Sequence, residues 1–81
     1  IYTSCEPCPM CFSAIYWARI DTVFYAGTHA DAEKAGFDDA FIYNEIKLPM
    51  QQRSVLFEQV NAHQGFDPFA KWLAFDGKTH Y

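Results

Sequence analysis

The sequence predicts an α/β domain in which strands and helices alternate along the chain. Residues 1–4, 22–26 and 55–60 are rich in β-branched and aromatic residues, and the stretches between them carry apolar residues at helical spacing. Such alternation is typical of domains in which helices pack on a sheet. The 81 residues are 51% hydrophobic and contain only four Gly and four Pro, which excludes a disordered or repetitive chain.

The first predicted elements are a strand end, a helix and a strand. Residues 1–4 have the composition of the end of a strand, so we expect the sequence to begin inside a domain. Pro7 and Pro9 precede a stretch without Gly or Pro, which predicts a helix that begins near them, with Arg19 close to its end. Residues 22–26 then predict a short buried strand that stops at Gly27.

The second part of the chain predicts three more helices and another strand. Residues 30–47 predict two short helices that are separated at Gly36 and end before Pro49. Residues 55–60 predict a strand with only partial alternation of apolar side chains. After a loop, Asp67 and Pro68 predict the N-cap and first turn of a last helix.

The charge balance argues against a nucleic-acid partner. Ten acidic and six basic residues give a net charge of −4, whereas nucleic-acid binding depends on a basic surface that neutralises phosphates. No apolar run approaches the roughly 18 residues that a membrane span needs, and no signal segment is visible. We therefore expect a soluble, cytoplasmic protein without a membrane partner.

Three cysteines lie at positions 5, 8 and 11, and the odd count excludes a simple disulfide framework. An iron–sulfur site needs a fourth thiolate, which this sequence lacks. A redox pair formed by Cys8 and Cys11 and a set of three free buried thiols remain as alternatives.

The spacing of Cys8 and Cys11 also predicts a metal site. A helix that starts at Pro7 or Cys8 places the two thiols on one face, with β-carbons roughly 5–6 Å apart. Both sulfurs then reach one metal at about 2.3 Å, and the helix N-terminus favours both as thiolates. Zinc is the expected metal because sulfur ligands select it, and Cys5, outside the helix, is expected to point elsewhere.

The segment Glu6-Pro7-Cys8-Pro9-Met10-Cys11, followed by residues 14–19, resembles the zinc site of the cytidine deaminase-like superfamily. Within that superfamily, residues 36–43 and the closing Tyr81 resemble the small bacterial guanine deaminases. The resemblance spans residues 1–81 but corresponds to a C-terminal half. It implies a three-layer cytidine deaminase-like α/β fold, of which this chain supplies the zinc helix, a strand, short helices, a strand and the C-terminal helix.

The first half of that superfamily's signature, His-x-Glu, does not occur in this sequence. The resemblance assigns the third zinc ligand to that His and the proton transfers to that Glu. We therefore expect these 81 residues alone to be inactive and the complete protein to be active. His29, His63 and His80 lack metal-ligand spacing and are predicted to be solvated surface residues.

The resemblance implies zinc-dependent hydrolysis of guanine to xanthine and ammonia, with attack at C2 of the base. It makes Cys8 and Cys11 zinc ligands and makes Asp39 a proton relay or an acceptor for the substrate amino group. Trp17 is predicted to stack on the purine, or alternatively to belong to the core. The resemblance also implies a homodimer with exchanged C-terminal segments, in which Tyr81 closes the neighbour's site.

Structural roles are predicted for the neighbours of these residues. Asp38 is expected to cap the helix that follows Phe37, and Glu6 to act as a capping residue or as a support behind the metal ligands. Phe12, Phe37 and Phe41 are expected to be core residues.

Two other classes of function stay open from the sequence. A tRNA adenosine deaminase, or another nucleobase deaminase, shares the Pro-Cys-x-x-Cys helix, although Arg53, Lys71 and Lys78 form no basic patch. A non-catalytic zinc module or a Cys-x-x-Cys redox module is the alternative without deaminase chemistry.

Overall fold

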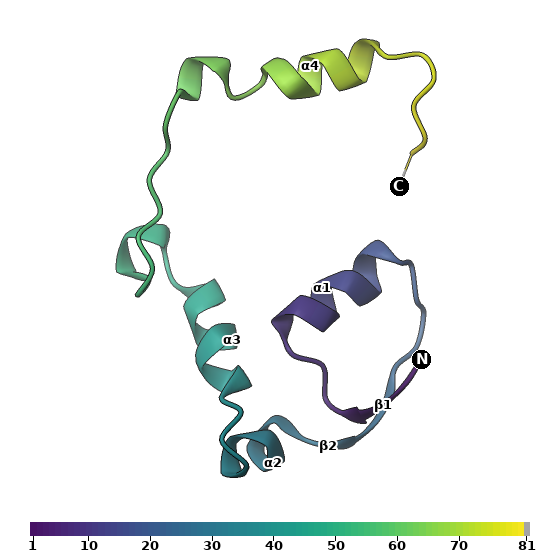
Figure 1. The fold of residues 1–81 in the computed structure, drawn as a ribbon, viewed down its shortest axis with the longest axis vertical. Coiled ribbons are helices and arrows are strands. Elements are labelled where there is room, and N and C mark those ends of the chain that lie inside the picture. The colour runs from purple at the N-terminus through teal and green to yellow at the C-terminus, as the bar shows by residue number, and fades with distance from the viewer. Residues whose placement is uncertain (81) are drawn as a thin grey trace.

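The computed structural model describes residues 1–80, and their elements follow the predicted alternation. Figure 1 shows the path of the chain from the N-terminal βαβ unit to a distant C-terminal helix. In chain order the elements are β1 (Tyr2–Cys5), α1 (Pro9–Trp17), β2 (Phe24–Gly27), α2 (His29–Lys34), α3 (Asp39–Lys47) and α4 (Asp67–Ala74), with single 3₁₀ turns at Met50–Gln52 and Ala62–Gln64.

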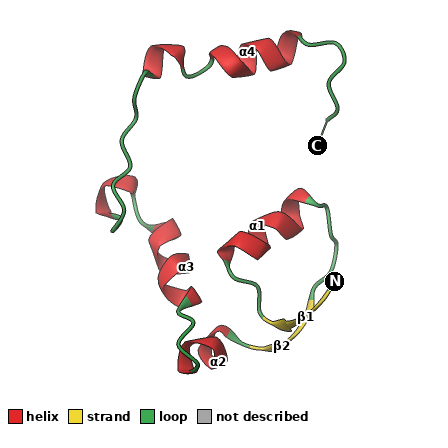
Figure 2. Ribbon diagram, viewed as in Figure 1, coloured by secondary structure: helices red, strands yellow, loops and turns green. Residues whose placement is uncertain are grey.

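The two strands are parallel neighbours, and α1 connects them (Figure 2). Parallel strands need a crossover connection, which α1 provides. In the register of the pair, Tyr2 lies opposite Phe24, and their rings stack at 5.1 Å between centroids. The amide of Glu6 donates to the carbonyl of Gly27 at 2.8 Å, which fixes the chain just before α1. The N-terminal strand, the helix and the second strand form as predicted, but β2 is largely exposed, so its predicted burial is wrong for the described chain.

Helix α1 begins where the prolines predict, and a left-handed residue follows its C-cap. Cys8 is its N-cap, and Pro9 occupies the first turn, where a missing amide proton costs no hydrogen bond. Arg19 follows the C-cap with φ 58° and donates from its guanidinium to the carbonyl of Tyr16 at 3.4 Å. Arg19 thus occupies the negative end of the helix dipole, as its position predicts.

Helices α2 and α3 are two short helices, as predicted, and each has a side-chain cap. Thr28 and Asp31 form a capping box at α2, and hydrogen bonds from Thr28 hold the pKa of the Asp31 carboxyl below its usual range. Asp38 accepts a hydrogen bond from the amide of Phe41 at 3.1 Å, which confirms its predicted capping role. Between the helices, Gly36 has φ +92°, a conformation that favours glycine.

The prediction of a strand at residues 55–60 is wrong. Within residues 1–80 this segment is an irregular connection, because no neighbouring strand lies beside it to accept its backbone hydrogen bonds. The turn before it is tied to the end of α3. Arg53 donates to the carbonyls of Glu45 and Ile46 at 3.2 Å each, and the Glu45 carboxylate accepts from Ser54.

Helix α4 forms at the predicted place but lies apart from the rest of the chain (Figure 1). Phe66, rather than Asp67, is its N-cap, while Pro68 lies in the first turn as expected. Phe69, Trp72 and Leu73 are 61%, 42% and 63% exposed, so the described chain leaves the apolar residues of α4 uncovered.

The chain is open rather than compact. Its radius of gyration is 17.6 Å, against about 12 Å for a compact domain of this length. Among residues 1–80, Pro9 is buried but no large hydrophobic side chain is, and Phe12, Phe37 and Phe41, predicted as core residues, are exposed. These residues bury little against one another and offer broad apolar surfaces instead. None of the described helices is long and apolar enough to cross a bilayer.

Candidate metal and substrate site

Cys8 and Cys11 lie together at the start of α1. Cys8 is the N-cap with extended backbone, and its carbonyl accepts the amide of Phe12 at 2.8 Å. Cys11 lies one turn along the helix, so the two side chains share one face. All three cysteines are free thiols. The backbone therefore places the two thiols about one helical turn apart, as their sequence spacing predicts.

The two thiols influence each other's ionisation. A hydrogen bond with Cys8 and the nearby charge of Cys8 raise the pKa of the Cys11 thiol above its usual range. Desolvation and the charge of Asp39 act in the same direction. In the metal-free pair these effects oppose the helix N-terminus, which favours the thiolate. A divalent cation between two sulfurs removes the repulsion, so this donor pair fits a soft metal such as zinc.

The thiols and Asp39 line the same pocket, which has a volume of about 630 Å³ and a predominantly apolar wall. Asp39 is the first residue of α3 and is half-buried. The pocket is lined by Ile1, Thr3, Cys5, Glu6, Pro7, Cys8, Cys11, Ala14, Ile15, Ala18, Ile20, Ala32, Phe37 and Asp39. A carboxylate thus faces the same space as the two sulfurs, although it lies 28 residues after Cys11 in the sequence.

Trp17, which is also predicted to contact the substrate, is not among the described residues that line this pocket. Trp17 is the last residue of α1, about 9 Å along the helix axis from Cys11, and is 66% exposed. Tyr81 lies outside the described residues. Cys5, on β1, also lines the pocket, and its thiol donates to the carbonyl of Thr28 at 3.9 Å.

His29 differs from its predicted role as a solvated residue in a loop. It is the first residue of α2, and its side chain is only 24% exposed. Its ring lies against Tyr43 with centroids 4.8 Å apart, while its Nδ1 lies 3.5 Å from the Glu6 carboxylate. These contacts bury the ring against α3. His63 and His80 are exposed, as expected.

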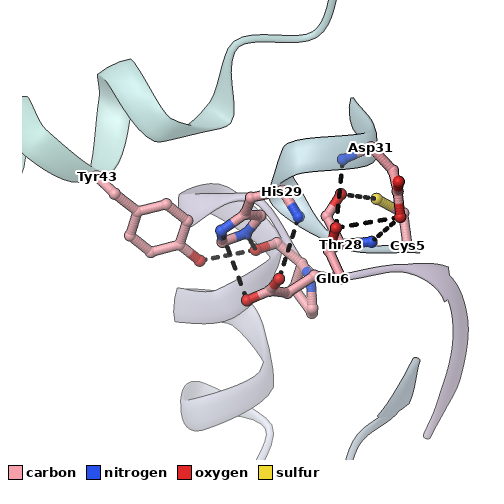
Figure 3. Close-up of polar contacts among 7 residues, drawn as sticks. Cys5, Glu6, Thr28, His29, Asp31 and Tyr43 are labelled. Carbon is pink, nitrogen blue, oxygen red and sulfur yellow. Dashed lines mark hydrogen bonds and ion pairs between the residues drawn. The ribbon is translucent and has the colours of Figure 1, made fainter. Parts of the chain in front are cut away.

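Glu6, His29 and Tyr43 surround the chain just before Cys8 (Figure 3). The Glu6 carboxylate accepts the backbone amide of His29 at 3.1 Å, which confirms that Glu6 acts as a cap. The hydroxyl of Tyr43 donates to the carbonyl of Pro7 at 2.7 Å. Desolvation is the main cause of a raised pKa at the Tyr43 hydroxyl, which therefore stays protonated as a donor at neutral pH. The sequence did not point to Tyr43, because 36 residues separate it from Pro7.

A complete set of metal ligands is not formed by the described part of the chain. Within residues 1–80, no group of three His, Cys, Asp or Glu side chains is arranged to hold a metal ion. The resemblance assigns the third ligand to a His-x-Glu segment outside this sequence, which stays a prediction.

A match of the N-terminal part of the chain to a known family indicates the class of this site. Residues 1–27, which contain β1, α1 and β2, match the family described as "Cytidine and deoxycytidylate deaminase zinc-binding region". The match confirms zinc as the cofactor expected from the paired cysteines and confirms the resemblance to the zinc deaminases.

Comparison with individual proteins gives a more specific similarity. The chain is 54% identical over all its 81 residues to guanine deaminase of Bacillus subtilis (strain 168), of which it covers 52%. The X-ray structure of guanine deaminase from Bacillus subtilis superposes on it with a TM-score of 0.91 and 55% identity, covering 99% of this chain and 51% of that one. The cytidine deaminase-like fold is thereby confirmed, and the chain spans about half the length of these relatives.

Proposed function

We propose that the protein containing this chain is a zinc-dependent guanine deaminase that hydrolyses guanine to xanthine and ammonia. The convergence of Cys8, Cys11 and Asp39 on one apolar pocket carries this proposal. The similarity to the Bacillus subtilis guanine deaminase along the whole chain supports guanine as the base. This proposal places the protein in the cytoplasm, which remains a prediction from the sequence.

The residues of this chain have different proposed roles, which follow from their side-chain chemistry. Cys8 and Cys11 are positioned to hold the metal, and zinc supplies the Lewis acidity that activates water for attack on the ring. Asp39, across the pocket, accepts hydrogen bonds from the N–H and amino groups of guanine and so orients C2. The apolar wall excludes bulk water and strengthens these polar contacts.

We also propose that the C-terminal segment, residues 68–81, packs on a partner subunit. Helix α4 stands away from the βαβ unit, and its apolar residues have no cover from the described chain. A second subunit is the occupant that the resemblance implies for this surface. Trp17, at the exposed end of α1, remains a candidate for stacking on the purine or for this interface.

Cysteine variants of the complete protein test the proposed activity. Cys8→Ser and Cys11→Ser should each remove zinc and lower kcat/KM for guanine by about 100-fold or more, because several kcal/mol of transition-state stabilisation depend on the metal. Xanthine formation and zinc content are measured together. Cys5→Ser is the matched control for zinc content and should retain the metal, since its thiol is directed toward Thr28.

The same experiment separates the alternatives. Full deamination by Cys8→Ser would contradict the proposal. A wild-type protein that forms a reversible Cys8–Cys11 disulfide and deaminates no base would be a redox module instead, and zinc without deamination would indicate a structural zinc module.

A further inference from the structure

The side chains of Tyr43 and His29 contact the backbone that immediately precedes Cys8, and the Glu6 carboxylate in turn contacts His29. Tyr43 comes from α3, His29 from the start of α2, and Glu6 from the loop before α1. Figure 3 shows Tyr43 and His29 directed toward the same short stretch of chain. The segment 6–8 is therefore fixed by two helices that are far from it in sequence.

The Pro7 carbonyl is the focus of this arrangement. The hydroxyl of Tyr43 donates to its oxygen at 2.7 Å, and Nε2 of His29 lies 3.2 Å from the same oxygen. A carbonyl has two lone pairs and can accept both hydrogen bonds. Since proline has no amide proton, its carbonyl is the only backbone hydrogen-bonding group through which this residue can be fixed.

The remaining contacts fix the two donors. The Glu6 carboxylate accepts the amide of His29 at 3.1 Å and lies 3.5 Å from its Nδ1. The Tyr43 ring packs on His29 and also meets Phe12 of α1 edge-on, with centroids 6.2 Å apart. The hydroxyl of Tyr43 is thus held by ring packing on both sides, which reduces the entropy lost when it donates.

We propose that Tyr43 is a positioning residue for the zinc site, because its hydrogen bond to the Pro7 carbonyl fixes the backbone from which the Cys8 thiol reaches the metal. This inference rests on the proposed function, since it assigns zinc to Cys8 and Cys11. Groups that orient metal ligands without touching the metal typically change metal affinity by about 10–100-fold when they are removed. The proposal extends this principle to a hydrogen bond on the backbone next to a ligand.

Tyr43→Phe in the complete protein tests the proposal, because it removes one hydroxyl and keeps the ring that packs on His29 and Phe12. Zinc affinity is measured by competition with a chromogenic chelator, and zinc release by transfer to that chelator in excess. We expect the affinity to fall about 10-fold or more and the release to accelerate. Tyr16→Phe is the matched control, because Tyr16 also packs on Phe12, at 4.8 Å, but is 64% exposed.

A merely structural role for Tyr43 predicts a different result. It would lower the unfolding temperature of the metal-free protein and leave zinc affinity within twofold of the wild type, and that outcome overturns the inference. The wild type separates this failure from failure of the proposed function. A wild type that binds zinc through Cys8 and deaminates guanine keeps the proposed function even if Tyr43→Phe has no effect, whereas a wild type without zinc contradicts both.

Discussion

Two adjacent carboxylates, Asp38 and Asp39, have separate environments. Asp38 accepts the amide of Phe41 and so serves the helix, whereas Asp39 lines the pocket with Cys8 and Cys11. A helix turns by about 100° per residue, so neighbouring side chains at its start are directed differently. At the scale of single residues, position within one turn therefore separates a capping role from a role toward the substrate.

Asp39→Asn tests this separation, because it preserves shape and removes the charge. We expect kcat/KM for guanine to fall about 100-fold or more if Asp39 relays a proton or orients the base, in line with the usual size of such contributions. Steady-state kinetics of the complete protein provide the measurement. Asp38→Asn is the control, since asparagine caps helices as well as aspartate does. Equal activity of the Asp39→Asn variant and the wild type would show that Asp39 has no role in catalysis or substrate binding.

The helices were the most predictable elements, because their start and stop signals are local. Pro9 and the N-cap Cys8 define the start of α1, and Gly36 with its positive φ separates α2 from α3. The strand predicted at 55–60 does not form, because a strand depends on a partner that local composition does not reveal. Regular structure was thus predicted where a few neighbouring residues determine it.

The same difference between local and distant residues decides which part of the candidate site can be predicted from the sequence. The cysteine pair is visible in sequence because its two ligands lie three residues apart on one helix. The cluster of Glu6, His29 and Tyr43 is not, because its members come from a loop and two helices and meet only after folding. For the same reason the sequence wrongly predicts a solvated surface position for the half-buried His29 ring.

The cap of α3 yields a prediction at the scale of the element. Asp38→Ala should lower the free energy of unfolding of the complete protein by about 1 kcal/mol, because the amide of Phe41 loses its side-chain acceptor. Chemical denaturation monitored by circular dichroism measures this loss. Asp38→Asn should retain most of the stability. If Asp38→Ala unfolds at the wild-type denaturant concentration, the observed cap does not stabilise α3.

At the scale of the whole molecule, the chain presents surfaces rather than a core. Its radius of gyration of 17.6 Å and the exposed aromatic residues of α4 show that residues 1–80 do not cover their own apolar area. Burial of apolar area is the dominant favourable term in folding, so these surfaces need cover from further polypeptide. The partner subunit proposed for α4 would cover part of this apolar surface.

The exchange of C-terminal segments can be tested by mixing subunits. If Tyr81 closes the neighbour's site by stacking on the base, Tyr81→Ala should raise KM for guanine about fivefold or more, since such a contact is worth roughly 1–3 kcal/mol, while His80→Ala should leave KM unchanged. Refolding Tyr81→Ala subunits together with Cys8→Ser subunits should restore part of the wild-type activity, because the mixed dimer combines one intact metal site with one intact tail. No recovery in a verified mixed dimer would contradict the exchange.

The central claim is that Cys8 and Cys11 at the start of α1 hold a zinc ion in the complete protein. Native mass spectrometry of that protein, with Cys8→Ser and Cys5→Ser alongside, tests it most directly, because metal and subunit number appear in one spectrum. The account predicts one zinc per subunit in the wild type and in Cys5→Ser, and none in Cys8→Ser. A wild-type subunit without zinc, or equal zinc in Cys8→Ser, would contradict it.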